Sequence, residues 1–179
     1  LQGTLDGTDE WQVERFLVSQ GVMVALAGVP ALYYNTLLAA PNNLQGMADT
    51  GRNRTINRKK WTMTQIASRL SNEQDPSHSV LEGLKKLLHI RRQQPAFHPE
   101  APQTCLNVDE RVFVLKRGHP NEAHLLCLFN LSRETVVLNK TDLGLMNAQS
   151  FSACFIQGDV VDSGSTIHMS PYAMVWIQR

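Results

Sequence analysis

Three arginines stand close together in a polar stretch of the chain, Arg52, Arg54 and Arg58, and Asn57 precedes the last of them. A planar guanidinium group can donate two parallel hydrogen bonds to a carboxylate, a phosphate or a pair of sugar hydroxyls, whereas lysine offers a point charge. This spacing therefore predicts a binding site for a small polar or anionic ligand. The same pattern is also typical of a solvated loop whose arginines pair with nearby acids.

The stretch before these arginines changes abruptly from apolar to polar. Gly28-Val29-Pro30 interrupts a helical pattern, and the short apolar and aromatic run 31–34 predicts a buried parallel strand. In an α/β barrel, the loops at the C-terminal ends of the strands build the active site. We therefore expect a long polar loop after Tyr34 that carries the arginines to a ligand, with a turn at Asn42-Asn43.

Helical periodicity covers most of the remaining first half. It predicts a helix over 9–27, a short helix over 59–72, and a third helix that starts at Asp75-Pro76 and ends before Pro95. Cations are favoured in the last turns of a helix, so we expect the basic residues there to be solvated. These residues are Lys85, Lys86, His89, Arg91 and Arg92.

From Gln103 onward the hydrophobic period changes from near 3.6 to 2, which predicts an all-β module. The expected strands are 103–108, 111–117, 124–131, 135–138, 150–155, 166–169 and 172–178. The prolines between Pro95 and Pro102 mark the expected boundary. An antiparallel two-layer sandwich is the architecture that such closely spaced strands favour.

Four segments resemble the sucrose phosphorylase group of the α-amylase superfamily. They are GVPALYYNTLLAAPNN, TGRNRTINR, RRQQPAFHPEAP and SPYAMVWIQR, and the TGR-x-R-x-INR pattern is closer to the glucosylglycerate phosphorylase-like members. The resemblance implies a fold of class α/β plus all-β. Residues 1–96 would form the C-terminal end of a (β/α)8 catalytic barrel, with its last strand and flanking helices, and 103–179 an antiparallel β-sandwich domain.

The resemblance also implies a function. The parent enzyme would be a retaining α-glucoside phosphorylase that transfers a glucosyl unit from sucrose or a glucosylglycerate-like α-glucoside to phosphate. Its catalytic carboxylates precede the matching region, so this chain would be an inactive fragment without catalytic residues of its own. In the family, an arginine before the INR triplet contacts the glucosyl unit. A gapless match selects Arg54, whereas matching the Gly-Arg pair selects Arg52.

Composition limits the other possibilities. The 42% hydrophobic and 18% charged residues are typical of a soluble protein, and a formal charge of +1 predicts neither nucleic acid nor a membrane as partner. The cysteines, Cys105, Cys127 and Cys154, and the widely spaced histidines predict no disulfide framework and no metal site, and we expect no cofactor. We expect a cytoplasmic protein, with possible homo-oligomerisation through the exposed barrel edge.

Two alternative functions stay open at this point. The chain could be a non-enzymatic carbohydrate-binding or interaction β-sandwich module, or part of a hydrolase or isomerase of the same superfamily. A binding module usually presents a row of exposed aromatic residues. The aromatic residues of the β region are expected to face a core instead, because they alternate with polar residues along the strands.

Overall fold

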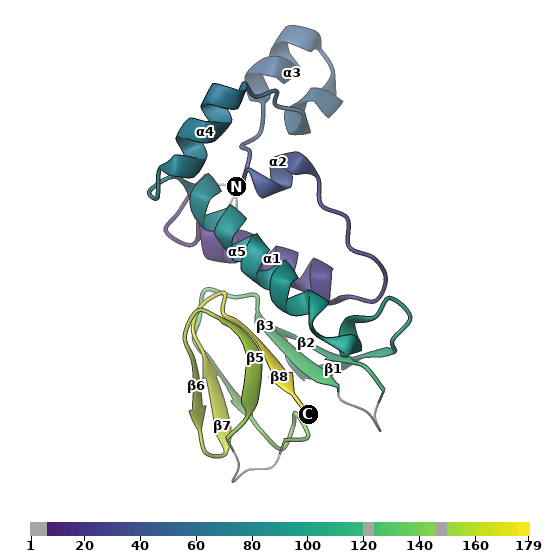
Figure 1. Ribbon diagram of the computed structural model, residues 1–179. Helices are drawn as coiled ribbons and strands as arrows, with labels where there is room; N and C mark the ends of the chain where they lie inside the picture. Colours follow the sequence, from purple (N-terminus) through teal and green to yellow (C-terminus); the bar gives the residue numbers. More distant parts are fainter. Residues whose placement is uncertain (1–6, 120–123, 146–149) are drawn as a thin grey trace. The chain divides into compact units, whose positions relative to one another are not determined.

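A computed structural model describes residues 7–119, 124–145 and 150–179, with helices first and strands after them (Figure 1). The helices are α1 (Gln12–Ala25), α2 (Tyr34–Leu37), α3 (Leu44–Thr50), α4 (Met63–Ser71) and α5 (Pro76–Arg92), with 3-10 turns at Asn53–Asn57 and Pro95–Phe97. No helix within these described ranges is long and apolar enough to cross a membrane.

The strands form two antiparallel sheets. They are β1 (Gln103–Asp109), β2 (Val112–Arg117), β3 (Leu125–Asn130), β4 (Val136–Asn139), β5 (Ser152–Gln157), β6 (Val160–Ser163), β7 (Thr166–Met169) and β8 (Met174–Gln178). The larger sheet has the order β1-β2-β3-β8-β5, and the smaller has the order β4-β7-β6. The predicted order of helices followed by antiparallel strands is confirmed.

The predicted strand over 31–34 is wrong. Tyr33 has extended backbone angles, φ −80° and ψ 142°, but a helical turn, α2, begins at Tyr34, and within the described ranges no strand pairs with this segment. A parallel strand needs neighbouring strands to satisfy its backbone groups, and none is available here. The expected long loop is also partly helical, since it contains α3 and the 3-10 turn at Asn53–Asn57.

Strand β6 is a strand that the sequence pattern did not predict. It covers only Val160–Ser163, between glycines 158 and 164, which both have positive φ. Its four residues pair with β7 in an antiparallel register from Val160↔Met169 to Ser163↔Thr166. A run this short shows almost no alternation in the sequence, so pairing with β7 decides its conformation.

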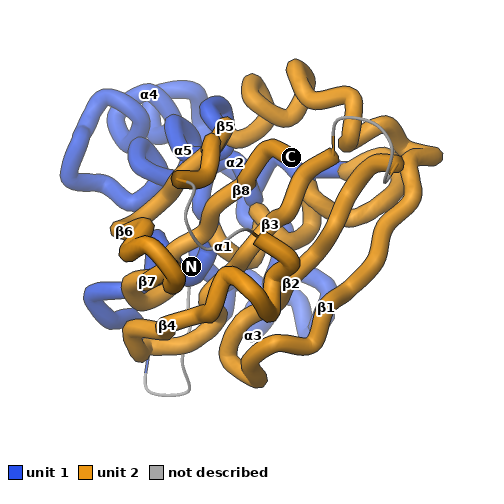
Figure 2. Tube along the Cα trace, turned by 90° about the horizontal axis from the view of Figure 1, so that it is seen from below, with its two compact units in different colours: residues 1–17, 31–86 blue, residues 18–30, 87–179 orange. Residues whose placement is uncertain are grey.

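The chain divides into two compact units, which Figure 2 shows in different colours. One unit contains 1–17 and 31–86, and the other contains 18–30 and 87–179. The second unit therefore includes the end of α1 and the end of α5 together with the described strands. The assignment of 1–96 to a barrel and 103–179 to a separate domain stays a prediction.

The core of the second unit lies between the two sheets. Most of its apolar side chains come from alternate positions of strands in both sheets: Val112, Val114, Leu126, Leu128, Val136, Leu138, Ile167, Met169, Val175 and Ile177. Leu143 and Ala173 join them from the connecting segments. This packing confirms the predicted antiparallel sandwich, because each sheet buries one face against the other.

The other face of the larger sheet is buried as well. Trp176 is fully buried, and its ring centroid lies 4.6 Å from that of Phe97 and 4.9 Å from that of Phe155. Gly21 of α1 lies against the same face, since a Cβ there would be 2.3 Å from the sulfur of Met174. The larger sheet therefore carries apolar side chains on both faces, unlike an ordinary exposed sandwich sheet.

An ion pair at the turn between β1 and β2 should make the stability of the fold depend on pH. Arg111 donates to both carboxylate oxygens of Asp109, at 2.7 and 2.9 Å, and also contacts Glu134 at 2.7 Å. Hydrogen bonds from the Arg111 side chain and backbone lower the pKa of Asp109 to about 2. A lowered pKa stabilises the fold above the unfolded pKa, and the benefit disappears as the pH falls through the folded value.

We therefore expect the free energy of unfolding to decrease between about pH 4 and pH 2, and the variant Asp109→Asn to flatten part of this decrease. Urea unfolding at a series of pH values measures this pH dependence of the free energy of unfolding. The matched control is Glu110→Gln, which changes an exposed carboxyl group in the same turn. An equally steep decrease in Asp109→Asn and wild type would contradict the assignment.

Candidate functional site

An open pocket of about 750 Å³ lies in the first unit, where the arginine-bearing segment meets the start of α2. Its lining residues are Tyr33, Tyr34, Asn53, Arg54, Ile56, Asn57, Arg58 and Lys60. Three of the four predicted site residues, Arg54, Asn57 and Arg58, thus lie around one pocket. Arg52 is exposed and is not among the lining residues.

Tyr33, Tyr34 and Lys60 are lining residues that the sequence analysis missed as site residues. Tyr33 and Tyr34 belong to the run 31–34 that the sequence predicts to be a buried strand, but they are 48% and 44% exposed. Their rings meet edge to face with centroids 4.7 Å apart. Their aromatic faces give the pocket an apolar wall on which a sugar ring can pack. The sequence feature that could have indicated their role in the pocket is the Tyr-Tyr pair directly before a polar segment.

Asn35 holds the two sides of this pocket together. Its side chain is only 6% exposed, and its Nδ2 donates to the backbone carbonyls of Asn57 at 3.2 Å and Lys59 at 3.1 Å. Its Oδ1 accepts a hydrogen bond of 2.8 Å from Nε1 of Trp61. One buried amide thus connects α2 to the segment that carries Asn57 and Arg58.

Two further contacts support this connection. The Tyr34 hydroxyl donates to the carbonyl of Lys59 at 2.9 Å, and the Asn43 amide donates to the carbonyl of Ile56 at 2.8 Å. The side chain of Asn43 also caps α3 by accepting from the amide of Gly46. The predicted turn residue is therefore a helix cap that also fixes the end of the arginine-bearing segment.

Trp61 packs instead of pointing into the pocket. Its ring lies under the ammonium group of Lys59, 4.3 Å from the centroid, and under the guanidinium group of Arg69, 4.9 Å away. Arg69 in turn donates to both carboxylate oxygens of Asp75. Burial alone would raise the pKa of Asp75, but hydrogen bonds from Arg69 and Ser77 hold it below its usual value.

The pocket is electrostatically positive. Among the residues that the structure describes, its lining contains Arg54, Arg58 and Lys60 and no carboxylate. The pKa of Tyr33 is raised, mainly by its hydrogen bond with Tyr34, so its hydroxyl stays protonated and can donate. A lining of cations, hydroxyls and an amide can bind an anion beside a polyhydroxylated ring.

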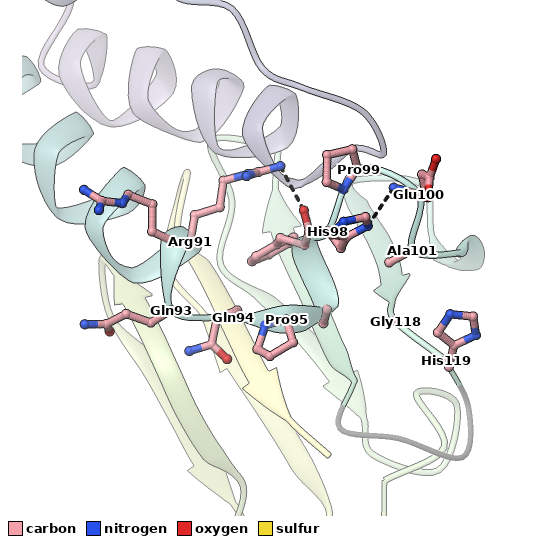
Figure 3. Close-up of a pocket in the computed structure, with 13 residues that line it drawn as sticks. Arg91, Gln93, Gln94, Pro95, His98, Pro99, Glu100, Ala101, Gly118 and His119 are labelled. Atoms are coloured by element: carbon pink, nitrogen blue, oxygen red, sulfur yellow. Dashed lines mark hydrogen bonds between the residues drawn. The ribbon is translucent and has the colours of Figure 1, made fainter.

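A second pocket, of about 740 Å³, lies in the second unit along the segment between α5 and β1 (Figure 3). Arg91 enters this region, but its guanidinium group donates to the carbonyls of Val24 at 2.7 Å and Phe97 at 3.2 Å. The expectation that Arg91 is solvated is therefore wrong, because the end of α1 and the turn after α5 cover it. Burial lowers the pKa of Arg91.

Arg117 plays the same structural part from β2. It is fully buried and donates to the carbonyls of Ala101 at 2.6 Å and His98 at 3.0 Å. Both arginines thus satisfy carbonyls of the segment 97–102, which has little regular structure of its own. These contacts tie both guanidinium groups to the backbone that forms the wall of the second pocket.

Within the described residues, no group of three or more His, Cys, Asp or Glu side chains could hold a metal ion.

No family model matches the chain. It is 38% identical over 122 residues to the glucosylglycerate phosphorylase of Spirochaeta thermophila, covering 68% of this chain and 21% of that protein. It is 29% identical over 173 residues to the glucosylglycerate phosphorylase of Escherichia coli, covering 97% of this chain and 30% of that protein. The chain matches the C-terminal portion of phosphorylases of the α-amylase superfamily.

The chain spans about 30% or less of the length of these relatives. A solved structure of an isomaltulose synthase mutant from Erwinia rhapontici NX5 with D-glucose has a TM-score of 0.71 and 12% identity, over 96% of this chain and 39% of that one. This likeness shows a shared fold of helices followed by antiparallel sheets. The resemblance noted from the TGR-x-R-x-INR segment is confirmed.

Proposed function

We propose that this chain forms one wall of the glucosyl and phosphate pocket in a retaining α-glucoside phosphorylase. The observation that carries the proposal is the homology to glucosylglycerate phosphorylases across 97% of the chain in the Escherichia coli relative. The lining of the first pocket supports it, because Arg54, Arg58 and Lys60 provide the positive charge that phosphate or a carboxylate-bearing aglycone needs.

In this proposal Arg54 contacts the glucosyl unit, and Asn57 and Arg58 complete the wall. Arg54 lines the pocket and Arg52 does not, which favours the gapless alignment with the INR triplet. The carboxylates that form and break the glucosyl ester lie outside this chain, so the chain alone is expected to be inactive. The parent substrate is sucrose or a glucosylglycerate-like α-glucoside, and the second substrate is inorganic phosphate.

The alternative of a carbohydrate-binding sandwich receives no support from the sheets. Phe129, Phe155, Tyr172 and Trp176 are all at most 6% exposed, so they form no platform for a sugar. Hydrolysis or isomerisation by the parent enzyme remains the alternative outcome of the experiment. Homo-oligomerisation through an exposed barrel edge also stays part of the proposal.

The test uses the protein encoded by the complete reading frame that contains this chain. Purified protein is incubated with glucosylglycerate or sucrose, with and without inorganic phosphate, and the products are followed by NMR. We expect α-glucose 1-phosphate to form only when phosphate is present, with retained anomeric configuration. Free glucose or an isomerised disaccharide at equal rates without phosphate would contradict phosphorolysis.

A further inference from the structure

Asn35 is more deeply buried than the side chains of the arginine-bearing segment that it contacts. It is 6% exposed, whereas Arg54, Asn57 and Arg58 are exposed. It is not among the residues that line the pocket. Its amide uses both of its polar atoms, since Nδ2 donates to the carbonyls of Asn57 and Lys59 and Oδ1 accepts from Trp61. A buried amide with every polar atom satisfied is specific for one arrangement of its partners.

These contacts belong to a set of interactions that leads from Asn35 through Trp61, Arg69, Asp75 and Ser77 back to Leu38, next to α2. Trp61 is held by Asn35 on its edge and by Lys59 and Arg69 on its faces. Arg69 pairs with Asp75 at 2.9 Å.

The set then returns to α2. The Asp75 carboxylate accepts from the Ser77 amide at 2.8 Å, and the Ser77 hydroxyl donates to the carbonyl of Leu38 at 2.6 Å. Leu38 directly follows α2, which contains Asn35. The two ends of the set therefore meet at α2 and the residue that follows it, and the carbonyls at 57 and 59 are fixed relative to Tyr33 and Tyr34.

We propose that Asn35 is a positioning residue that sets the direction of the Asn57-Arg58 segment toward the ligand, and this inference rests on the proposed function. The carbonyls of Asn57 and Lys59 flank Arg58 on both sides. Fixing them fixes the backbone from which the Arg58 side chain starts. Without the amide, two carbonyls lose their donor and the arginine side chain samples more directions, at a cost in ligand affinity.

The main variant is Asn35→Asp, which keeps the size and the acceptor for Trp61 but replaces the amide donor by a carboxylate facing two carbonyls. In the full-length protein we expect KM for inorganic phosphate to rise by at least about tenfold with a smaller change in kcat. We also expect faster hydrogen exchange in peptides covering 53–60. The milder variant Trp61→Phe keeps an aromatic ring beside Lys59 and Arg69 but removes the donor to Asn35. It should change both KM and hydrogen exchange in the same direction.

Asn130 provides a matched control in the second unit. It is fully buried and also donates through Nδ2 to backbone carbonyls, those of Glu134 at 2.7 Å and Ser170 at 2.8 Å. Asn130→Asp should lower the melting temperature while leaving KM for phosphate and exchange over 53–60 unchanged. A general loss of stability would give the same result at both asparagines.

The outcomes separate the two proposals. If wild type performs no phosphorolysis, the proposed function fails, and the exchange experiment still decides whether Asn35 orders the 53–60 segment. The second case is that the wild-type enzyme is active and Arg54→Lys is impaired. If Asn35→Asp and Trp61→Phe then both keep the KM for phosphate and the hydrogen exchange of the wild type, the positioning role of Asn35 is overturned. An equal rise of KM in Asn130→Asp would overturn it as well.

Discussion

Replacing Arg54 by lysine is expected to reduce the specificity constant of the full-length enzyme on the order of 30- to 1,000-fold. Arg54 lines the positive pocket together with Asn57 and Arg58. Lysine keeps the charge but loses the planar pair of donors, which leaves a sugar hydroxyl or a phosphate oxygen poorly satisfied. Roughly 2–4 kcal/mol of transition-state stabilisation is at stake.

Steady-state phosphorolysis by the single variants Arg52→Lys, Arg54→Lys and Arg58→Lys measures this effect, with thermal melting as the control for folding. Arg52 is the matched control, because it is a nearby exposed arginine outside the pocket lining. Arg58→Lys should reduce the specificity constant less if Arg58 interacts with the anion mainly through its positive charge, which lysine keeps. A large loss of activity in Arg52→Lys alone would select the alignment that matches the Gly-Arg pair. Near-native turnover in all three variants would show that the arginine-bearing segment is not part of the active site.

Replacing Trp176 by alanine is expected to decrease the free energy of unfolding by about 3–5 kcal/mol. The side chain is 0% exposed and its ring lies against those of Phe97 and Phe155, so truncation creates a cavity between the larger sheet and the segment after α5. The aromatic neighbours come from different elements and cannot collapse fully into that space, which explains the large value.

Urea unfolding followed by circular dichroism measures this change. Trp176→Phe should lose clearly less free energy of unfolding, because it keeps an aromatic ring and because the indole Nε1 has no hydrogen-bond partner among the residues that the structure describes. Val161→Ala, on a residue that is 54% exposed in β6, serves as a control and should change stability by at most about 0.5 kcal/mol. If the free energy of unfolding of Trp176→Ala decreases by less than about 1 kcal/mol, the packing of Trp176 against Phe97 and Phe155 does not stabilise the larger sheet.

The sequence by itself determined the elements that have a strong internal pattern. The apolar face and the Asp-Pro start of α5 predicted its position, and the alternation from Gln103 onward predicted most of the strands. The side-chain period is a local property of helices and strands, so it can be read without knowledge of the neighbours. The same is true of the arginine spacing, which indicated the segment that lines the first pocket.

Only the tertiary structure decided what the segments with weak or ambiguous patterns do. The run 31–34 is apolar enough for a strand, yet no strand pairs with it within the described ranges, and Tyr33 and Tyr34 line a pocket instead. Arg91 has the sequence position of a solvated cation, yet its guanidinium group donates to the carbonyl of Val24, which is far away in the sequence, and to that of nearby Phe97. Burial, strand pairing and hydrogen-bond partners depend on segments far apart in the chain, so a local sequence pattern cannot predict them.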